Sequence, residues 1–421
     1  MSILLGAVAD DFTGATDLCS TLVKEGMRVV QLTGLPRGQI DLGQAQAVVI
    51  ALKSRTAPTA EAVQESLTAT RWLREHGAQQ IIFKVCSTFD STDKGNIGPV
   101  ADALQAELDS PVSVVCPAFP ENGREVRGGV LYVNGLALAD SPMRDHPLTP
   151  MRDSDLQRLM QAQSKGKVEK LVLETVQSGS QAIQAALEQL ALEGANYIVA
   201  DATSVDELRA IGHALQAHRL VTGASGIARG LPDNFRRAGL LDAPVAAGMP
   251  KLQGRKLALA GSASTATRGQ IAAVTERWPC RQLTLDEIAD NNHLAAEIID
   301  WLSSLPEDSP ALVYGSGDPE QVRRNQQKYG AEKAGAMLEG CLSAIAVAAR
   351  AAGTRKFIVA GGETSGAVVS ALGVQALQIC GEICPGVPWT QTIEADPLAI
   401  ALKSGNFGGE DFFDRAFQVL P

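Results

Sequence analysis

Short apolar runs alternate with longer segments of helical periodicity along the first half of the chain. The apolar runs show little alternation with polar residues, as expected for parallel strands buried on both faces. We predict strands at residues 3–9, 48–52, 81–85, 112–116, 171–173 and 198–200. The segments between them carry apolar residues at helical spacing and predict helices at 60–75, 99–108, 181–192 and 205–218. This alternation predicts βαβ units and a doubly wound α/β fold.

Two segments interrupt the alternation. Asn134 and Gly135 separate two apolar stretches, which is the signature of a β-hairpin with a two-residue turn. Residues 141–150 follow and are rich in proline and polar side chains, which predicts a long ordered loop. Loops of this length are often functional.

Periodicity fades between residues 223 and 254, where Gly, Ala and Pro are frequent. Domain boundaries commonly fall in such stretches, and 421 residues exceed the size at which a single core stops growing. We therefore predict two domains, residues 1–245 and 246–421. A second α/β series begins afterwards, with strands predicted at 255–260, 312–314 and 357–360 and helices at 294–305 and 321–352. The predicted architecture is α/β, with two mostly parallel sheets flanked by helices and an active-site cleft between the domains.

The net charge, the apolar runs and the cysteine content of the chain limit the kinds of binding partner and the cellular location that we expect. Lys and Arg number 37 against 47 Asp and Glu, a net charge of −10, and no basic stripe is interleaved with aromatic residues, which disfavours a nucleic-acid partner. The N-terminus lacks a basic signal-peptide region, and no uninterrupted apolar run reaches membrane length, which disfavours a membrane partner. Seven scattered cysteines fit reduced thiols, and Cys380 and Cys384 lack the further ligands of a zinc site. We expect a soluble cytoplasmic protein, either a monomer or a homodimer.

Two adjacent acids, Asp10 and Asp11, follow the first predicted strand, with Thr13 just beyond them. In a doubly wound sheet the carboxyl ends of the strands open into the ligand crevice. Acids there can accept hydrogen bonds from sugar hydroxyls, deprotonate one, or bind Mg²⁺. Helix capping is the alternative, because Asp favours N-terminal turns. The position favours function, with Asp10 as the first candidate for a catalytic base and Thr13 as a substrate-binding residue.

A dense run of hydroxyl, acidic and basic side chains begins at Lys84 and includes Ser87, Thr88 and Asp90. A polyhydroxy acid needs cations for its carboxylate and short polar side chains for its hydroxyls. A solvated loop is the alternative, but a lysine on an apolar strand is rarely buried without a partner. Lys84, Ser87 and Thr88 are therefore candidate substrate-binding residues, and Asp90 joins Asp10 as a candidate catalytic acid, as does Asp11.

Polar residues also follow two other predicted strands. Arg55 follows the strand at 48–52, and Asn122 and Arg124 follow the strand at 112–116. Arginine can bind a carboxylate or phosphate through two parallel hydrogen bonds. Among the histidines, His146 has the irregular, polar surroundings that suit a binding site. Four successive polar strand ends predict an anion-binding rim on this sheet.

Three segments of the second domain, residues 260–267, 360–366 and 402–411, are rich in glycine and hydroxyl side chains. Backbone amides and helix N-termini can bind phosphates in such segments, and glycine allows close approach. The chain has no Walker A motif and no G-x-G-x-x-G motif, and ordinary strand-to-helix turns favour the same residue types. Three such segments together favour a nucleotide site. The candidate nucleotide-binding residues are Ser262, Ser264, Gly361, Gly362, Glu363, Thr364, Gly405 and Asn406.

Taken together, these motifs resemble the four-carbon acid sugar kinase family. The resemblance spans nearly the whole chain, over residues 9–17, 84–98, 117–124, 261–264, 361–364, 385–389 and 403–408. It implies an N-terminal domain that binds the sugar acid and a C-terminal domain that binds the nucleotide, with ATP contacts at 261–264, 361–364 and Gly405. Residues 86–92 and 402–408 are most similar to those of the 3-oxo-tetronate kinase subfamily, whose members phosphorylate the terminal 4-hydroxyl of a 3-oxo four-carbon acid.

The resemblance therefore implies a phosphotransferase that uses ATP and Mg²⁺, with the metal ligands left open. Lys84, Arg55 and Arg124 are the candidates for binding the substrate carboxylate. A kinase for threonate or erythronate is the alternative substrate assignment. A sugar-acid isomerase or aldolase could use the same polar rim without needing the glycine-rich segments, and a non-catalytic ligand sensor would bind without turnover.

Overall fold

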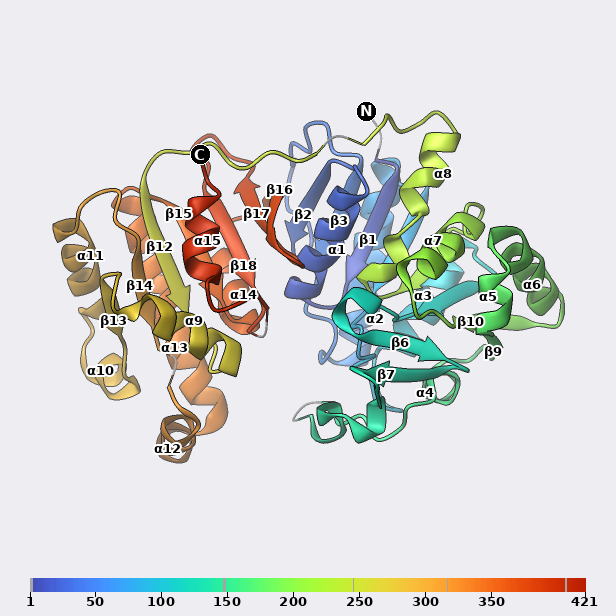
Figure 1. The fold of residues 1–421 in the computed structure, drawn as a ribbon, viewed down its shortest axis with the longest axis horizontal. Coiled ribbons are helices and arrows are strands. Elements are labelled where there is room, and N and C mark those ends of the chain that lie inside the picture. The colour runs from blue at the N-terminus through green and yellow to red at the C-terminus, as the bar shows by residue number, and fades with distance from the viewer. Residues whose placement is uncertain (1–2, 147–148, 245, 316, 406) are drawn as a thin grey trace. The chain divides into compact units, whose positions relative to one another are not determined.

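The computed structural model describes residues 3–146, 149–244, 246–315, 317–405 and 407–421 (Figure 1). The chain divides into two compact units, Met1–Ala246 and Ala247–Pro421. Residue 245, at which the sequence analysis ends the first domain, lies outside the described residues.

The first unit contains an all-parallel sheet in which the strand order is β2-β3-β1-β4-β11-β5-β10-β9. Its strands are buried on both faces, which explains why they appear in the sequence as continuous apolar runs. The strands are β1 (Leu5–Ala9), β2 (Val29–Thr33), β3 (Ala47–Ala51), β4 (Gln80–Lys84), β5 (Ser113–Cys116), β9 (Lys167–Leu171), β10 (Ala195–Ala200) and β11 (Leu220–Gly223).

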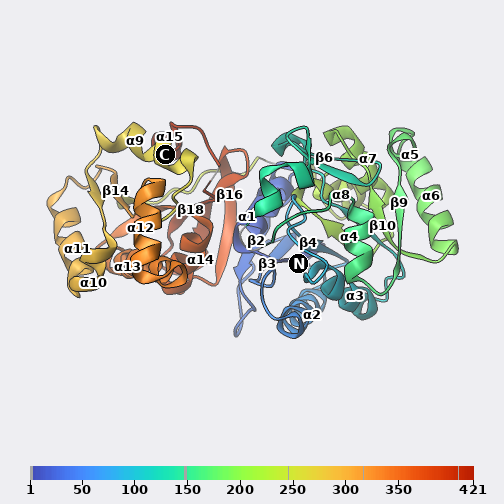
Figure 2. The ribbon, with the colours of Figure 1, turned by 90° about the horizontal axis from the view of Figure 1, so that it is seen from below.

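Helices cover both faces of this sheet (Figure 2). α2, α3 and α4 pack in a row on one face, and α1 packs on the other together with α6, α7 and α8. The bounds are α1 (Phe12–Lys24), α2 (Thr59–Glu75), α3 (Ile97–Leu108), α4 (Leu156–Gln163), α5 (Leu173–Gln177), α6 (Ser180–Leu192), α7 (Val205–Ala214) and α8 (Leu231–Arg237), with 3₁₀ turns η1 (Pro120–Asn122), η2 (Leu138–Asp140), η3 (Pro142–Asp145) and η4 (Ser225–Ala228). The doubly wound arrangement predicted from the sequence is thus present in this unit.

The strand register brings the carboxyl ends of five strands level at one edge of the sheet. Ala9 is paired with both Ala51 and Lys84, and Gly223 is paired with both Lys84 and Cys116. The segments that leave β1, β3, β4, β11 and β5 therefore start side by side. This edge carries the polar rim that the sequence predicts.

A small antiparallel sheet is inserted after β5, made of β6 (Arg124–Arg127), β7 (Val130–Val133) and β8 (Leu136–Ala137). The predicted two-residue turn joins β7 to β8, and Asn134 and Gly135 both have positive φ, 51° and 83°. These are the backbone conformations that a tight hairpin turn requires, so the hairpin prediction is confirmed. In the predicted loop at 141–150, the structure forms η3, and residues 147–148 lie outside the described set.

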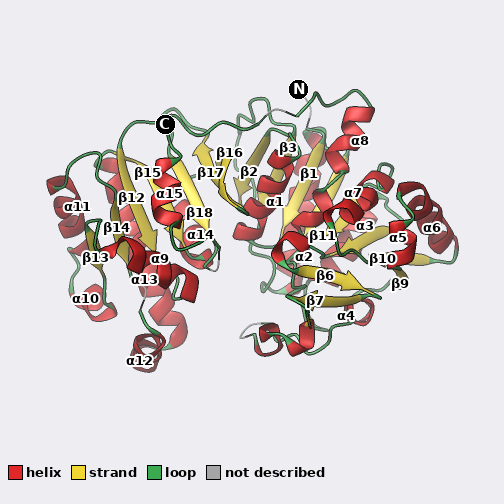
Figure 3. Ribbon diagram, viewed as in Figure 1, coloured by secondary structure: helices red, strands yellow, loops and turns green. Residues whose placement is uncertain are grey.

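The second unit contains a mixed sheet, with parallel strands in the order β13-β14-β12-β15-β18 followed by the antiparallel strands β17 and β16 (Figure 3). Its core includes Trp389, Phe412 and Phe413, all fully or almost fully buried. The strands are β12 (Arg255–Ala260), β13 (Cys280–Gln282), β14 (Ala311–Tyr314), β15 (Thr354–Ala360), β16 (Ala376–Cys384), β17 (Val387–Thr392) and β18 (Ala399–Lys403).

Two groups of helices accompany this sheet. α9 packs with α15, while α10, α11, α12 and α14 each contact the long helix α13. The bounds are α9 (Thr265–Thr275), α10 (Leu285–Asp290), α11 (Leu294–Ser304), α12 (Pro319–Tyr329), α13 (Ala331–Ala351), α14 (Gly362–Ala371) and α15 (Phe412–Gln418). In the described part of the chain, α13 is the one helix whose length and composition would suffice to cross a membrane. An alanine-rich helix that packs inside a soluble protein passes the same test, and Leu342, Ile345 and Ala349 of α13 are buried in this unit.

Three sequence-based element predictions differ from the structure. The strand predicted at 171–173 is wrong, because β9 ends at Leu171 and α5 starts at Leu173, whose amide donates to the buried carboxylate of Asp201 at 3.1 Å. The helix predicted at 205–218 ends at Ala214. The single helix predicted at 321–352 is two helices, broken at Gly330, which has a φ of 84°.

Candidate active site

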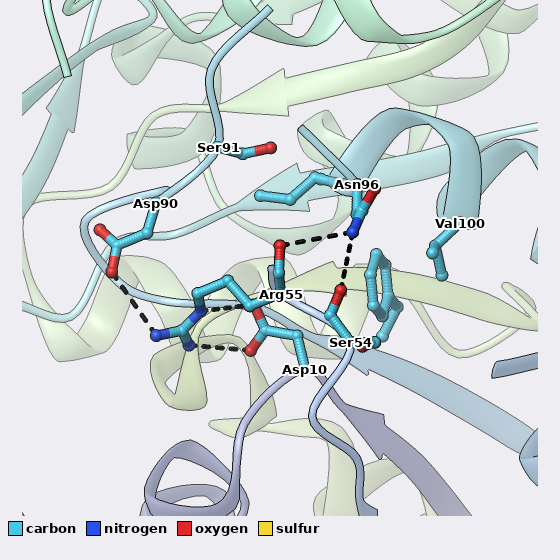
Figure 4. Close-up of a pocket in the computed structure, with 9 residues that line it drawn as sticks. Asp10, Ser54, Arg55, Asp90, Ser91, Asn96 and Val100 are labelled. Carbon is cyan, nitrogen blue, oxygen red and sulfur yellow. Dashed lines mark hydrogen bonds and ion pairs between the residues drawn. The ribbon is translucent and has the colours of Figure 1, made fainter. Parts of the chain in front are cut away.

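Arg55 joins three carboxylates at the rim of the first unit, of which Figure 4 shows Asp10 and Asp90. Its Nε and Nη2 donate to the two oxygens of Asp10 at 3.0 and 2.9 Å. Nη2 also donates to Oδ1 of Asp11 at 2.8 Å, and Nη1 lies 3.6 Å from Oδ2 of Asp90. The three acids predicted as catalytic candidates are therefore clustered around one predicted substrate-binding arginine.

The parallel register explains this clustering. Asp10 leaves β1, Arg55 follows β3, and Lys84 ends β4, and these three strands are neighbours in the sheet. The amide of Asp10 donates to the carbonyl of Lys84 at 3.1 Å, and the amide of Arg55 donates to the carbonyl of Asp10 at 3.2 Å. Backbone hydrogen bonds thus continue past the strand ends and hold the three segments together.

Asp10 and Asp11 are adjacent in sequence but have opposite pKa shifts. Burial raises the pKa of Asp10 above its ordinary value, although Arg55 opposes this shift. Burial also acts to raise the pKa of Asp11, but Arg55, Lys84 and hydrogen bonds from Thr13 and Gly14 outweigh it, so the pKa of Asp11 is lowered. Asp11 is also the N-cap of α1, since its Oδ1 accepts from the Gly14 amide at 3.1 Å and its Oδ2 accepts from Thr13 Oγ1 at 2.9 Å. The capping alternative therefore applies to Asp11, in addition to its contact with Arg55.

Lys84 is a buried cation beside these acids. Its side chain is 2% exposed, and its Nζ donates to the carbonyl of Val85 at 2.8 Å. Its positive charge acts to lower the pKa of Asp10, Asp11 and Asp17. A Cβ added at Gly14 would lie 3.0 Å from Nζ and 2.1 Å from Asp11 Oδ1, so the start of α1 needs a glycine at this position.

The loop after β4 orients Asp90 through a short chain of hydrogen bonds. Thr88 Oγ1 donates to Asp90 Oδ1 at 2.6 Å and lies 2.9 Å from Cys86 Sγ. Between these two residues, Phe89 is fully buried with a φ of 50°, a strained conformation for a bulky side chain. Packing of Phe89 therefore fixes a backbone turn that points Asp90 toward Arg55. Ser87 is half-buried in the same loop.

A cavity of about 10 Å³ lies beside the cluster, lined by Asp10, Ser54, Arg55, Asp90, Asn96 and neighbouring side chains. This volume holds about one water molecule. Asn96 donates to the carbonyl of Ser54 at 2.8 Å (Figure 4) and to the carbonyl of Ala57 at 2.8 Å, and it thereby fixes the segment that carries Arg55. The hydroxyl of Ser54 is buried and has no hydrogen-bond partner among the described residues. It is a group that a water molecule in this cavity could satisfy.

Three predicted substrate-binding residues lie elsewhere in the first unit. Asn122 and Arg124 follow β5, which β11 separates from β4, and Arg124 Nη1 donates to the carbonyl of Asn122. His146 Nδ1 lies 2.9 Å from Thr149 Oγ1. Within the described ranges, none of these three residues forms a hydrogen bond or ion pair with the Arg55 cluster. Strand ends that share an edge can still differ in how far their loops extend, which the sequence pattern does not specify.

Sequence reasoning missed two members of this rim. Asp17 is 8% exposed, and its Oδ2 accepts from Ser225 Oγ, from the turn after β11, at 2.6 Å. Burial raises the pKa of Asp17, with Lys84 opposing. The available signal was helical spacing, because Asp17 lies four residues after Thr13 and therefore on the same face of α1. Ser225 carries no such signal.

In the second unit, three strand ends meet at one edge. Ala260 is paired with Ala360, which is paired in turn with Lys403, so the glycine- and hydroxyl-rich segments that follow begin side by side. Ser264 caps α9 by accepting from the amide of Thr267 at 3.2 Å, and its hydroxyl donates to the carbonyl of Gly405 at 2.5 Å. The structure therefore brings the three predicted nucleotide-binding segments together.

Close packing explains the glycines of these segments. A Cβ at Gly261 would lie 2.2 Å from Thr364 Oγ1, and one at Gly405 would lie 2.5 Å from Ser262 Oγ. Gly361 has a φ of 131°, which other residues rarely adopt. Thr364 is buried against the first segment, while Gly362 and Glu363 are exposed at the start of α14. Asn406, also predicted to bind nucleotide, lies outside the described residues.

Two anchors of these segments were not predicted as site residues. Gln270, fully buried on α9, donates its Nε2 to the carbonyls of Phe407, Gly408 and Gly409 at 3.0 Å each. Lys403, fully buried at the end of β18, donates to Thr267 Oγ1 at 3.0 Å. Both side chains act on backbone or hydroxyl groups, an arrangement that a sequence motif does not reveal.

The described residues contain no group of three or more His, Cys, Asp and Glu side chains placed to hold a metal ion. Arg55 occupies the acidic cluster of the first unit instead.

Two family models match the chain in the same two halves. The sugar-binding N-terminal domain matches residues 5–231, and the nucleotide-binding C-terminal domain matches residues 257–413. Among curated proteins, the chain is 51% identical to a 3-oxo-tetronate kinase of Cupriavidus necator and 50% identical to one of Burkholderia multivorans. Each comparison covers 99% of this chain and 97% of the relative.

The chain belongs to the four-carbon acid sugar kinase family. This confirms the resemblance inferred from the motifs. The Arg55 cluster lies in the part of this kinase that matches the sugar-binding model, and the three glycine-rich segments lie in the part that matches the nucleotide-binding model.

Solved structures of similar proteins share the fold of this kinase over its full length. One from Salmonella typhimurium LT2, provisionally described as a tRNA synthase, has a TM-score of 0.92 and 42% identity, with 99% of each chain covered. Another from Haemophilus influenzae has a TM-score of 0.84 and 39% identity, covering 98% of this chain and 99% of the other.

Proposed function

We propose that this protein is a 3-oxo-tetronate kinase, which transfers the γ-phosphoryl group of ATP to the terminal 4-hydroxyl of a 3-oxo four-carbon sugar acid. The observation that carries the proposal is the 51% identity to a 3-oxo-tetronate kinase over almost the entire length of both chains. Two local arrangements support it, the Arg55 cluster in residues 1–245 and the convergent glycine-rich segments in residues 246–421. We assign the sugar acid to the first range and the nucleotide to the second.

For the substrate carboxylate we propose Lys84, Arg55 and Arg124 as the cations. Lys84 is buried and makes one short backbone hydrogen bond, and an ammonium group can donate three. Arg55 already forms ion pairs with three carboxylates, so a bound substrate carboxylate would share the guanidinium group with them. The remaining candidates, Thr13, Ser87, Thr88, Asn122 and His146, offer groups suited to sugar hydroxyls and stay predictions.

The hydrogen bonds favour Asp90 over Asp10 as the catalytic base. Both oxygens of Asp10 accept short hydrogen bonds from Arg55, and both oxygens of Asp11 are engaged as well. Asp90 Oδ2 has the longest contact to Arg55, 3.6 Å, and is therefore the most available of the carboxylate oxygens. In the proposed step, the 4-hydroxyl oxygen forms a bond to the γ-phosphorus, the bond from phosphorus to the oxygen of ADP breaks, and the hydroxyl proton moves to Asp90.

For the nucleotide we propose the segments with Ser262, Ser264, Gly405 and Asn406, and residues 361–364. The amides at the N-termini of α9 and α14 suit phosphate groups. Mg²⁺ usually binds through phosphates and one or two carboxylates, and it would neutralise phosphate charge during transfer. Glu363 is exposed at the start of α14, and we propose its carboxylate as a ligand of the Mg²⁺. The transfer needs both halves to meet, and the cleft between the domains predicted from the sequence stays part of this proposal.

Different observations argue against the alternative functions, namely an isomerase or aldolase and an RNA-binding enzyme. An isomerase or aldolase has no use for a nucleotide-binding domain, which matches residues 257–413. A net charge of −10 gives little support to RNA binding of the kind that a tRNA synthase requires. The cytoplasmic location and the choice between monomer and homodimer stay predictions.

ADP release tests the proposal directly. The full chain is incubated with Mg-ATP and a panel of four-carbon acids that contains both 3-oxo-tetronate stereoisomers, threonate and erythronate, with a coupled assay for ADP. We expect the highest kcat/KM with one of the 3-oxo acids. Preference for threonate or erythronate would support the alternative kinase assignment, and binding of acids without any ADP release would support a ligand sensor.

A further inference from the structure

Lys403 has an unusual environment for a lysine. Its side chain is fully buried, although lysine is among the residues least often found inside proteins. Nζ donates to Thr267 Oγ1, to the carbonyl of Ser404 and to the carbonyl of Gly405, each at 3.0 Å. An ammonium group has three donors, so these three oxygens use all of them.

No carboxylate compensates this charge. Across the residues that the structure describes, no acidic side chain lies within ion-pair distance of Lys403, and the aromatic ring of Phe412 has its centroid 5.9 Å from Nζ. A buried charge without a counter-ion is costly, and its environment here consists of neutral oxygens. A coordination shell of hydroxyl and carbonyl oxygens is what proteins offer to a bound metal cation of low charge.

The oxygens that hold Nζ belong to the nucleotide segments themselves. Gly405 carbonyl also accepts from Ser264 Oγ and from Thr267 Oγ1, so one backbone oxygen joins α9 to the segment after β18. Strand β18 carries Lys403 beside Ala360, the first residue of the segment at 360–366. The ammonium group thus contacts the segments at 260–267 and 402–411, at the end of a strand paired with the strand that leads into the segment at 360–366.

We propose that Lys403 is a positioning residue of the nucleotide site, whose ammonium group acts as a built-in monovalent cation beneath the phosphate-binding segments. It holds the Gly405 and Thr267 oxygens in place and supplies positive charge that the phosphates of the nucleotide then compensate. The inference rests on the proposed nucleotide role of this unit. It also explains how the site can function without the lysine of a Walker A motif.

The test compares three variants of the full chain. Lys403→Met removes the charge and fills the volume, Lys403→Ala leaves a cavity, and Lys356→Met is the matched control. Lys356 is another buried lysine of the same sheet, 6% exposed, four residues before the end of β15 and therefore about 13 Å from the strand end. The measurements are the Kd for ADP by calorimetry, the KM for ATP and for the sugar acid, kcat, and Tm.

We expect Lys403→Met to weaken ADP binding by about tenfold or more, because three charge-assisted hydrogen bonds and a buried charge are lost. The KM for the sugar acid should change less than about twofold, and Lys356→Met should leave ADP binding within about twofold of the wild type. Added ammonium or methylammonium should restore about fivefold or more of the ADP affinity of Lys403→Ala, since the cavity can accept a free cation. The same salts should leave the wild type unchanged.

The inference is overturned if Lys403→Met binds ADP as tightly as the wild type while only its Tm falls. It is also overturned if ammonium fails to improve ADP binding by a folded Lys403→Ala. If Lys403→Ala does not fold, the Kd of Lys403→Met decides alone. Because ADP binding is measured separately from turnover, a wild type that binds ADP but phosphorylates none of the acids would contradict the proposed function and leave this test intact.

Discussion

Both carboxylate oxygens of Asp10 accept hydrogen bonds from Arg55, at 3.0 and 2.9 Å. Such a bidentate pair fixes the orientation of both side chains, and Arg55 opposes the rise in the Asp10 pKa that burial causes. Asp10 is therefore better suited to holding Arg55 than to exchanging a proton with a substrate. Asp11 adds a further hydrogen bond to the same guanidinium group, at 2.8 Å.

Replacing Asp90 with Asn should lower kcat by about 10²–10⁴, the usual contribution of a positioned base. The KM for the sugar acid and the Tm should change little, because Asn can still accept the hydrogen bond from Thr88. Steady-state kinetics and thermal unfolding measure these effects. If Asp90→Asn retained most of its kcat while a folded Asp10→Asn lost it, the roles of the two acids would be reversed.

Replacing Arg55 with Met should destabilise the first unit by about 3 kcal/mol, because Asp10 would remain buried without its partner. The loss should appear as a lower midpoint in urea unfolding, together with a large rise in the KM for the sugar acid. Arg71→Met is a suitable control, since Arg71 pairs with Glu107 on the exposed surface at 2.7 Å. Surface pairs contribute roughly 0–1 kcal/mol, so equal losses in both variants would contradict the assigned role of Arg55.

The strands that sequence reasoning found are those buried on both faces, such as β1 and β4 in the first unit. Of the strands that were missed, β2, β11 and β18 are buried in the same way, while β13, β16 and β17 are different in kind. β16 and β17 include polar or half-exposed positions such as Gln378, Glu382 and Gln391, and β13 is only three residues long. Their place in the sheet depends on pairing with neighbours that are distant in the sequence, and apolar periodicity alone does not contain that information.

The candidate site shows the same division. Asp10, Arg55 and Lys84 could be predicted because they follow buried parallel strands, and parallel strands bring their carboxyl ends to one edge. Which of them touch could not be predicted, since it depends on strand order and on side-chain hydrogen bonds. Asp17 and Lys403 were missed for a related reason, because each lies within a regular element and its partners come from another one.

Replacing Gly14 with Ala should disrupt the start of α1, because the added Cβ would lie 2.1 Å from Asp11 Oδ1 and 3.0 Å from Lys84 Nζ. We expect a loss of about 1–2 kcal/mol from the broken cap, and a fall in kcat/KM as Asp11 and Lys84 shift. Gly340→Ala is the control, since Gly340 lies in α13 with open space around the position of a Cβ. Alanine there should stabilise the helix by up to about 1 kcal/mol. Similar kinetics for the two variants would show that the start of α1 has no role in the reaction.

The pH dependence of ADP binding provides a test of Lys403 that needs no substitution. Burial lowers the pKa of Lys403 from 10.5 to about 8, with Cys384 on β16 opposing the shift. Burial raises the pKa of the Cys384 thiol to about 11, so this neighbour stays neutral while Lys403 titrates. ADP affinity should therefore fall as the pH rises through about 8, where the ammonium loses its proton.

The stability of the protein should move in the opposite direction over the same range. Between about pH 8 and 10.5 the unfolded chain still binds a proton at Lys403 and the folded chain does not, so the free energy of unfolding contributed by this group rises with pH. Calorimetric ADP titrations and urea unfolding at pH 7.5, 8.5 and 9.5 measure the two trends, and about one pH unit on either side of the pKa captures most of the change. Lys403→Met should lose both trends. If affinity and stability fell together in the wild type, alkaline unfolding would explain the weaker binding and the charge of Lys403 would not.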